Sequence, residues 1–282
     1  GGVLLPMMMN MIATQPVKDY GFLSAQHVQL MTEIERRAYA DRAKYLGDAD
    51  FFKVPVQQLT SEAYARERMK DYSPNKAGNS VAIQAGIIPE SEETTHFSVY
   101  DSAGNAVAVT TTLNGGYGSY TVVGGAGFLL NNEMDDFSVK PGVPNMYGAV
   151  GAEANAIEPG KRMLSSMTPT IVLKDKKPYI ITGTPGGTTI TTSVFQTLVN
   201  LLEFGMSAED AVNKPKFHHQ WLPDTIQVEK EFPMEVRTQL EQMGYKLRQR
   251  STIGRTELIL VWPDGRIEAV ADKRGEDHAA GY

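Results

Sequence analysis

Apolar residues recur at helical spacing in the first seventy residues of the chain. The clearest stripe consists of Val28, Met31, Ile34 and Ala38. It follows Ser24, a residue type that caps helix starts well, and Gly47 supplies a stop. The pattern predicts one long helix between these two residues. A shorter helix is expected from Thr60 or Ser61 to Met69, and the apolar run before Asn10 is typical of a buried helix.

From Thr94 onward the apolar residues recur with the period of two that is typical of strands. Residues 94–100 and 106–110 alternate around a turn at 101–105, which predicts a hairpin. Further strands are expected at 170–173 and 179–182, near Ile226 and Leu247, and in a second hairpin over 257–271. Helices are expected over 188–204 and from Ser207 and Pro233. Because helices gather before Thr94 and strands after it, the order favours an α+β fold over alternating βαβ units.

Residues 72–93 are rich in Ser, Pro, Asn and Gly and end in acidic residues, which predicts a linker with little to bury.

The chain is 282 residues long and has 41% hydrophobic residues, which is ordinary for a globular protein. Its formal net charge of −6 argues against a nucleic-acid partner. It has no cysteine, which excludes disulfides and thiolate metal ligands. The first apolar run is too short to span a membrane. We expect the chain to be a fragment or a processed piece.

Several residues could carry chemistry. Gly186-Gly187, between a strand and a helix, could present N–H groups to an oxyanion, although a tight turn explains the glycines equally well. Asp135-Asp136 and His218-His219 lack metal-ligand spacing, so solvated loop carboxylates and a strand-edge histidine pair are the simpler interpretations. Ser165-Ser166 is unremarkable alone.

Thr94 opens a strand directly after the acidic end of the linker. If the Glu93–Thr94 bond were cut, the new α-amino group could act as the base for the threonine hydroxyl, as in N-terminal nucleophiles. An ordinary strand threonine remains the alternative on these grounds.

Together these motifs resemble the γ-glutamyltransferase (γ-glutamyltranspeptidase, glutathione hydrolase) family. The matching stretches are TTHFS (94–98), GNAVAVT (104–110), LNNEMDDF (130–137), KRMLSSMTPT (161–170), GTPGG (183–187), FHHQW (217–221) and AGY (280–282), with ADRAKYLGD (40–48) upstream. The likeness implies a four-layer αββα sandwich of the N-terminal nucleophile hydrolase type, incomplete on its N-terminal side. It divides the chain into the end of a large subunit (1–93) and a small catalytic subunit (94–282).

The resemblance implies a precursor that cuts itself between Glu93 and Thr94. Thr94 then attacks the γ-amide of glutathione or another γ-glutamyl compound, and the resulting ester passes to water, an amino acid or a dipeptide. The site residues that the resemblance implies are Thr94 as nucleophile, Thr112 as its support, Gly186 and Gly187 in the oxyanion hole, Asn114, Glu133 and Asp136 around the α-amino group, Ser165 and Ser166 near the α-carboxylate, and Tyr147 on a lid.

The family also places an arginine for the α-carboxylate on a part of the large subunit that would precede Gly1. We therefore expect this chain alone to be weakly active or inactive. No metal or organic cofactor is expected, and the resemblance implies a periplasmic or extracellular location. The alternatives are an acylase or γ-polyglutamate depolymerase of the same fold, and a non-maturing protein that binds γ-glutamyl ligands or serves as a scaffold.

Overall fold

The computed structural model describes residues 1–82, 94–143, 145–146 and 150–281. Its α-helices are α1 (Leu4–Ile12), α2 (Ala25–Tyr45), α3 (Val56–Leu59), α4 (Glu62–Met69), α5 (Thr189–Leu202), α6 (Ala208–Asn213) and α7 (Met234–Gln242). The strands are β1 (Thr94–Tyr100), β2 (Ala106–Thr112), β3 (Thr170–Lys174), β4 (Lys177–Gly183), β5 (Phe217–His218), β6 (Ile226–Val228), β7 (Leu247–Gln249), β8 (Glu257–Val261) and β9 (Ile267–Val270). Short 3-10 helices are η1 (Val17–Tyr20), η2 (Glu133–Asp136) and η3 (Glu153–Asn155).

The two expected N-terminal helices are present, and each begins at a serine cap. Ser24 Oγ accepts a hydrogen bond from the backbone N–H of His27 at 3.1 Å, which satisfies one donor at the start of α2. Ser61 does the same for Tyr64 at the start of α4, at 3.2 Å. Such a cap contributes about 1 kcal/mol. The capping residues and the apolar spacing thus suffice to place both helices.

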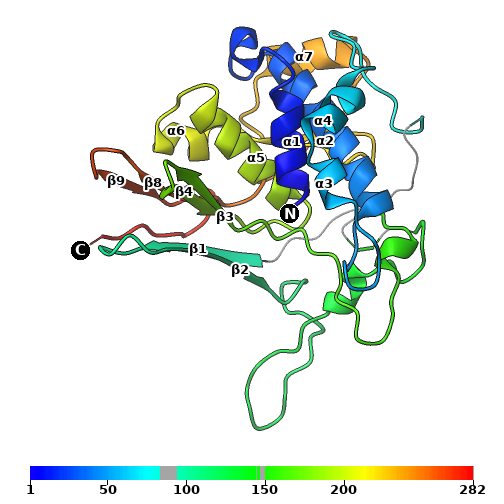
Figure 1. Ribbon diagram of the computed structural model, residues 1–282, viewed down its shortest axis with the longest axis vertical. Coiled ribbons are helices and arrows are strands. Elements are labelled where there is room, and N and C mark those ends of the chain that lie inside the picture. Colours follow the sequence, from blue (N-terminus) through cyan, green and yellow to red (C-terminus); the bar gives the residue numbers. More distant parts are fainter. Residues whose placement is uncertain (83–93, 144, 147–149, 282) are drawn as a thin grey trace.

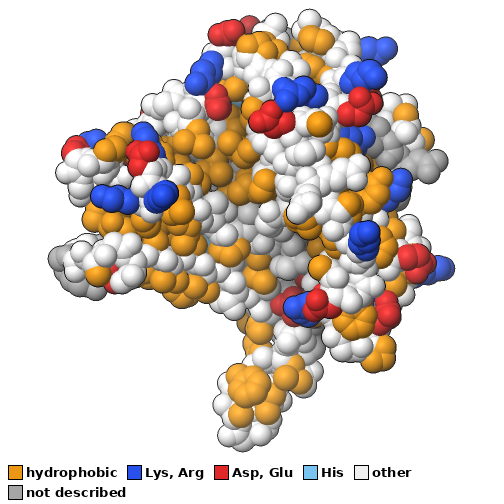
Figure 2. Space-filling model, viewed as in Figure 1, with side chains coloured by type: hydrophobic (Ala, Val, Ile, Leu, Met, Phe, Trp, Pro, Cys, Tyr) orange, Lys and Arg blue, Asp and Glu red, His pale blue; other side chains and the backbone are white. Residues whose placement is uncertain are grey.

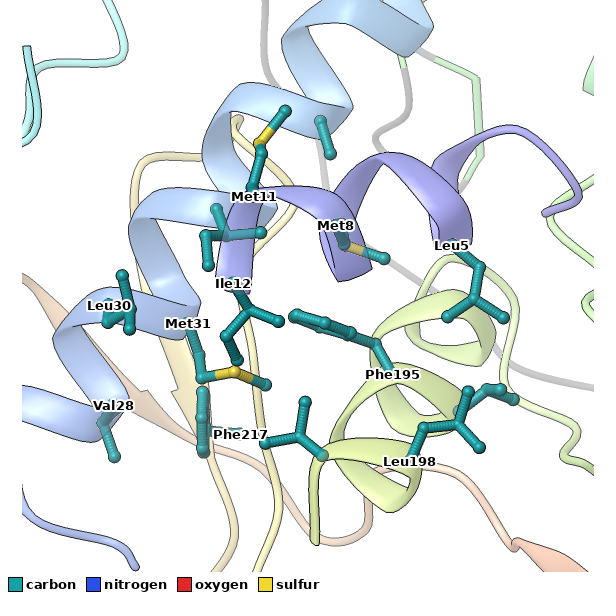
Figure 3. Packing of buried hydrophobic residues seen from close by; sticks show 14 of the residues in the cluster. Leu5, Met8, Met11, Ile12, Val28, Leu30, Met31, Phe195, Leu198 and Phe217 are labelled. Atoms are coloured by element: carbon teal, nitrogen blue, oxygen red, sulfur yellow. The ribbon is translucent and has the colours of Figure 1, made fainter. Parts of the chain in front are cut away.

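The hydrophobic core lies where α1 packs against α2 and α5. Figure 3 shows Met8 and Ile12 of α1, Met31 of α2 and Phe195 of α5 pointing toward one another, with Phe217 below them. All five side chains are buried, and fully burying such a side chain contributes about 1.5–3 kcal/mol. Among the described residues, no helix combines the length and apolar character needed to cross a membrane. The short apolar helix α1 is therefore a core element.

The main sheet is antiparallel and has the strand order β3-β4-β8-β9. Helices α5 and α6 cover one of its faces, and the β1–β2 hairpin lies against the other, as Figure 1 shows. A smaller sheet, β5-β6-β7, contains the parallel pair β6–β7. Helix, sheet and hairpin therefore form successive layers, and the expected α+β class is confirmed.

The hairpin keeps a regular register along its whole length, from Tyr100 opposite Ala106 to Thr94 opposite Thr112. Its outer face carries Phe97, Val99 and Val107, each close to half exposed. After β2 the chain extends into a projecting segment, residues 113–131, which reaches away from the body of the molecule in Figure 1. Orange side chains are prominent on this projection in Figure 2. Its exposed apolar side chains are Tyr117, Tyr120, Val122, Phe128 and Leu130.

The first half of the expected linker is held to the body of the protein by hydrogen bonds. Ser80 is fully buried, and its N–H donates to Asp224 Oδ2 at 2.9 Å. The N–H of Gly78 donates to Glu33 Oε1 on α2, also at 2.9 Å. Most side chains of residues 73–82 are exposed, as the linker prediction implies, but backbone hydrogen bonds to Glu33 of α2 and to Asp224 attach the segment to the body of the protein. Residues 83–93 of the expected linker lie outside the described residues.

The histidine pair lies in the interior of the protein. His218, on the edge strand β5, bonds Thr192 Oγ1 through Nδ1 at 2.8 Å and Gln220 Oε1 through Nε2 at 2.9 Å. His219 is also fully buried, and burial lowers its pKa to about 4. Both rings therefore belong to a buried polar network, and the low pKa of His219 keeps that ring neutral. Among the described residues, no group of three or more acidic or histidine side chains could hold a metal ion.

Candidate active site

Thr94 and Thr112 face each other at the end of the hairpin. The two residues are a cross-strand pair, so their side chains share one face of the ribbon. The Thr94 hydroxyl donates to Thr112 Oγ1 at 3.3 Å, and the backbone N–H of Asn114 donates to the same oxygen at 2.8 Å. Thr112 thus holds the Thr94 hydroxyl in place, and the position of Asn114 is tied to both.

The turn between β4 and α5 presents backbone N–H groups beside Thr94. Gly186 and Gly187 have φ angles of +135° and +54°, which residues with a Cβ rarely adopt. The carbonyl of Gly186 accepts from the N–H of Thr189 at 3.0 Å, so the turn leads directly into the helix. The first N–H groups of a helix have no partner within it, and the helix dipole favours negative charge there. Gly187 lines the same cavity as Thr94, so the turn can stabilise an oxyanion formed at Thr94.

His96 joins the hairpin to this turn. Its ring bonds Thr110 Oγ1 at 2.8 Å and Ser98 Oγ at 3.1 Å, and it lies so close to Gly183 that a Cβ there would overlap the ring. Burial lowers the pKa of His96 to about 4, so the ring is neutral at physiological pH. Because β4 ends at Gly183, this contact fixes the distance between the strand that carries Thr94 and the glycine turn.

Two acidic side chains of the 3-10 helix η2 lie together beside the cavity. Glu133 and Asp136 share a hydrogen bond, and only Asp136 lines the cavity itself. The pKa of Asp136 is raised to about 7, chiefly by burial; the charge of Arg42 opposes this rise, and the neighbouring Glu133 and Asp135 add to it. The simpler interpretation of a solvated carboxylate is therefore wrong for Asp136. Asp135 points elsewhere and accepts from the N–H of Met146 at 2.7 Å.

Asn114 and the two serines complete the polar lining. Asn114 is buried and has a φ of +72°, a left-handed conformation that asparagine tolerates better than most residues. Its Nδ2 donates to the carbonyl of Asn132 at 3.1 Å, just before η2. Ser165 Oγ accepts from the N–H of Met167 at 3.1 Å, and Ser166 Oγ accepts from Arg42 Nη2 at 3.3 Å. The turn, η2 and the serine segment therefore converge on the hydroxyl of Thr94.

One small cavity brings most of the expected site residues together. Its lining consists of Thr94, Thr112, Asn114, Asp136, Ser165, Ser166, Met167, Gly187 and Ile190. Gly186 and Glu133 are neighbours of lining residues rather than part of the lining. Tyr147, expected on the lid, and Glu93, expected at the cleavage point, lie outside the described residues.

Sequence reasoning missed Arg42, which reaches Ser166 from α2. A signal was present: Ile34, Ala38 and Arg42 are spaced by four, so the arginine continues the apolar stripe of the helix into a buried position.

The arrangement of a partly buried hydroxyl, a glycine turn at a helix start and convergent polar groups can be compared with known proteins. The family model described as gamma-glutamyltranspeptidase matches residues 1–282. The chain belongs to the gamma-glutamyltranspeptidase family. The resemblance inferred from the motifs is thus confirmed.

Individual relatives agree with this membership. The chain is 50% identical to the glutathione hydrolase proenzyme of Escherichia coli (strain K12) over 285 residues, which cover 100% of this chain and 49% of that protein. It is 34% identical over 277 residues to the acylase ACY 1 proenzyme of Pseudomonas sp. (strain SE83), covering 98% of this chain and 47% of the relative. The chain spans about half the length of the curated relatives it matches.

A solved structure places the fold. The gamma-glutamyltranspeptidase of Pseudomonas nitroreducens, complexed with L-DON, is 49% identical and has a TM-score of 0.64. The match covers 67% of this chain and 99% of the solved chain. The expected fold of the N-terminal nucleophile hydrolase type is therefore confirmed, together with membership of the gamma-glutamyltranspeptidase family.

Proposed function

We propose that the protein to which this chain belongs hydrolyses glutathione and related γ-glutamyl amides and transfers their γ-glutamyl group to water, an amino acid or a dipeptide. The observation that carries the proposal is the convergence of Thr94, Gly187, Asp136 and Ser166 on one cavity. A nucleophile, an oxyanion site, an acceptor for an ammonium and a donor for a carboxylate are what a γ-glutamyl substrate requires. The relatives named glutathione hydrolase proenzyme support the substrate class.

The chemistry begins once the peptide bond before Thr94 has been cut, which frees the α-amino group of Thr94. The freed α-amino group takes the proton of the Thr94 hydroxyl while Oγ1 attacks the γ-carbonyl carbon of the substrate. An ordinary α-amino pKa of about 8 suits this base near neutral pH. The negative charge that develops on the carbonyl oxygen lies at the N–H of Gly187. The proton then passes to the leaving amine, and a γ-glutamyl ester of Thr94 remains for attack by water or an acceptor amine.

Recognition of the γ-glutamyl group uses both sides of the cavity. Its α-ammonium needs hydrogen-bond acceptors, which Asp136, Glu133 and Asn114 would supply, and its α-carboxylate needs donors, which Ser165 and Ser166 would supply. Such charge-assisted bonds are stronger in a water-poor site than in solution. Tyr147 and Gly186 keep the roles that the resemblance implies, on the lid and in the oxyanion turn.

We propose that maturation cuts the precursor between Glu93 and Thr94 into two subunits that stay together. The relatives' designation as proenzymes supports processing. The solved Pseudomonas nitroreducens chain covers 67% of this chain, and residues 94–282 make up about the same fraction. A chain of residues 1–282 alone would be weakly active or inactive, because it spans about half of its relatives and leaves the outer face of the hairpin exposed. We also propose that the protein acts in the periplasm or outside the cell, the location that the resemblance to the family implies.

An acylase activity is the second candidate, and the acylase ACY 1 proenzyme favours it. A glutaryl group differs from a γ-glutamyl group by the missing α-ammonium, so it would leave Asp136 without a partner. Hydrolysis of glutaryl-p-nitroanilide and γ-glutamyl-p-nitroanilide by the same preparation therefore separates the two. We expect the γ-glutamyl substrate to be preferred, and a preference for the glutaryl substrate would overturn this choice.

The nucleophile is tested on the protein expressed at the length its gene encodes. Mass spectrometry should find two polypeptides that meet at Thr94. Thr94→Ala should abolish both the cut and γ-glutamyl-p-nitroanilide turnover. Thr95→Ala is the matched control, because Thr95 points to the exposed outer face of the hairpin. A single intact chain that binds γ-glutamyl ligands would instead support the scaffold alternative, and a cut in the Thr94→Ala variant would refute the nucleophile.

A further inference from the structure

Two threonine hydroxyls, one on each side of the glycine turn, are bonded to backbone carbonyls of the turn itself. Thr184 Oγ1 donates to the carbonyl of Pro185 at 2.8 Å. Thr189 Oγ1 donates to the carbonyl of Gly186 at the same distance, 2.8 Å. Both threonines are fully buried, so their hydroxyl protons have to find acceptors within the protein. Each of these carbonyls belongs to a peptide unit whose N–H is that of the next residue, Gly186 or Gly187.

Peptide planarity converts the direction of these carbonyls into the direction of the N–H groups that follow. In a trans peptide the C=O and the N–H lie in one plane and point in opposite directions. The peptide bonds on both sides of Gly186 are trans. Whatever fixes the Pro185 carbonyl therefore fixes the N–H of Gly186. In the same way, whatever fixes the Gly186 carbonyl fixes the N–H of Gly187.

The carbonyl of Gly186 is directed toward the first turn of α5, where both the hydroxyl and the N–H of Thr189 donate to it. The N–H of Gly187 therefore points away from the helix, on the side where Gly187 and Thr94 line the cavity. Among the described residues, neither the N–H of Gly186 nor that of Gly187 has an acceptor. Both groups are thus left to donate to the oxygen of a ligand.

The Thr184 hydroxyl is itself held from behind. The backbone N–H of Arg255 donates to Thr184 Oγ1 at 2.8 Å, so the proton of this hydroxyl remains available for the Pro185 carbonyl. Gly254 packs beside it: a Cβ at Gly254, whose φ is +66°, would lie 2.8 Å from Thr184 Oγ1. The segment before β8 therefore leaves Thr184 little room to change its rotamer, and the carbonyl that it holds keeps its direction.

We propose that Thr184 and Thr189 are positioning residues for the oxyanion: by holding the two carbonyls of the turn, their hydroxyls aim the N–H groups that follow at the oxygen that gains negative charge. The inference rests on the proposed γ-glutamyl chemistry and deepens it. Neither threonine lines the cavity, so both act through the backbone. Donors that are already oriented are effective because they do not have to turn when the charge develops.

The first experiment removes each hydroxyl and keeps the shape of the side chain. Thr184→Val and Thr189→Val are made in the protein at the length its gene encodes, and mass spectrometry gives the fraction of each preparation that is cut at Thr94. For the cut fraction we expect Thr184→Val to lower kcat for γ-glutamyl-p-nitroanilide about 10- to 100-fold, less than the roughly 10²–10³-fold cost of removing a donor outright. Thr189→Val should have the smaller effect, because the Gly186 carbonyl keeps its bond from the Thr189 N–H.

Conservative variants and a matched control separate positioning from a general loss of structure. Thr184→Ser and Thr189→Ser keep the hydroxyls and should recover most of the parent kcat. Thr197→Val is the matched control: Thr197 of α5 is equally buried, and its hydroxyl donates to the carbonyl of Ser193 at 2.9 Å, within the helix. This variant should leave kcat unchanged. An unchanged kcat in Thr184→Val, or a serine variant as slow as its valine counterpart, would overturn the proposal.

A pair of ligands gives a readout that does not depend on turnover. L-Glutamate carries its γ-carboxylate where the oxyanion would form, and L-norvaline has a methyl group in its place. In calorimetry on the same proteins, Thr184→Val should weaken glutamate binding about tenfold, the cost of weakening a hydrogen bond to a charged group, and norvaline binding by less than about twofold. Equal weakening of both ligands would mean a structural role and would refute the positioning.

The same pair of ligands keeps this result apart from the proposed function. A parent protein that binds glutamate without hydrolysing γ-glutamyl-p-nitroanilide refutes the function alone, and the difference between glutamate and norvaline still decides the positioning. A parent that binds neither ligand refutes both.

Discussion

Arg37 and Arg42 lie five residues apart on the same helix, and they are buried to nearly the same extent, at 3% and 7% exposed. Arg37 has a partner for every nitrogen: Nε donates to the carbonyl of Arg68 at 2.7 Å, Nη1 to Glu33 Oε2 at 2.6 Å and Nη2 to Asp71 Oδ1 at 2.8 Å. Arg42 has a single hydrogen bond to Ser166 and an unpartnered Nε among the described residues.

The pKa values of the two side chains move in opposite directions. Burial alone would lower the pKa of Arg37, but its bonds to Asp71 and Glu33 outweigh burial and raise it. Burial lowers the pKa of Arg42, because the charge of Asp136 does not compensate fully. Residue type and exposure are therefore poor guides to role. The number of anions that the protein itself provides distinguishes the fully paired Arg37 from Arg42, whose charge is neutralised only in part.

The sharpest test of the comparison is Arg37→Met. Losing this cation leaves Glu33 buried beside fewer positive charges, and breaking a buried ion pair costs about 3–5 kcal/mol in the free energy of unfolding. Chemical denaturation of parent and variant measures that loss. The KM of the folded variant for γ-glutamyl-p-nitroanilide should stay within about twofold, because the Arg37 network does not touch the cavity. A large change in KM with an unchanged free energy of unfolding would contradict the structural role of Arg37.

A second test disrupts the contact between His96 of the hairpin and Gly183, which precedes the glycine turn. In Gly183→Ala the new methyl group meets the His96 ring, which its two hydroxyl partners hold in place. Overpacking of this kind costs about 1–3 kcal/mol of stability. We expect kcat to fall together with stability, since Thr94 and Gly187 no longer keep their separation. Adding His96→Ala should restore part of both; failure to restore either would mean that the ring does not couple the two elements.

The third test concerns the charge of Asp136, whose pKa burial raises to about 7. Only its ionised form attracts the substrate ammonium, so KM should rise about tenfold per pH unit as the pH falls below 7. Glu133, Asp135 and Arg42 are the charged groups that act on it. In Asp136→Asn, KM should be higher above pH 7 and nearly independent of pH. A pH profile that keeps its slope in the variant would assign the titration to another group.

The same substitution has the opposite sign for stability. Because the folded-state pKa of Asp136 lies above its ordinary value of 3.8, its stabilising effect is complete below that value and is lost as the pH rises through about 7. Asp136→Asn should therefore gain stability over the parent above pH 7, whereas Arg37→Met loses it. Thermal unfolding at pH 5 and pH 8 checks this difference. A loss at both pH values would mean that Asp136 is a structural residue like Arg37.

The smallest effect is expected in the projecting segment. Tyr120 is 80% exposed, so Tyr120→Ser should change the free energy of unfolding by no more than about 0.5 kcal/mol. Denaturation of the chain of residues 1–282 measures this directly. A loss above about 1 kcal/mol would show that the segment contributes to the fold far more than its exposure indicates.

Local sequence signals predicted most of the secondary structure because these elements are specified locally. The serine caps and apolar stripe determine α2, and alternation with a short turn determines the hairpin. The attachment of residues 73–82 to the body of the protein could not be predicted this way, because it depends on Glu33 and Asp224, which are distant in sequence.

The candidate site likewise has features that the local sequence indicates and features that depend on distant residues. Position alone, at a strand start and before a helix, made Thr94 and the glycine turn candidates, and the resemblance of the motifs to a known family assigned their roles. The contact between Arg42 and Ser166 joins residues 124 positions apart, and the raised pKa of Asp136 depends on burial. Neither property has a local signature. A charged residue on an apolar stripe was the available signal for Arg42.

The register of the hairpin has a consequence for how insertions can be tolerated. The turn lies at the end remote from Thr94, and every residue between them alternates in direction. One residue inserted within β1 would exchange inner and outer faces on one side, so that the Thr94 hydroxyl would point into solvent. Two residues would restore the direction while moving the hydroxyl by one repeat along the strand. The parity of strand length, as much as the choice of threonine, thus places the Thr94 hydroxyl.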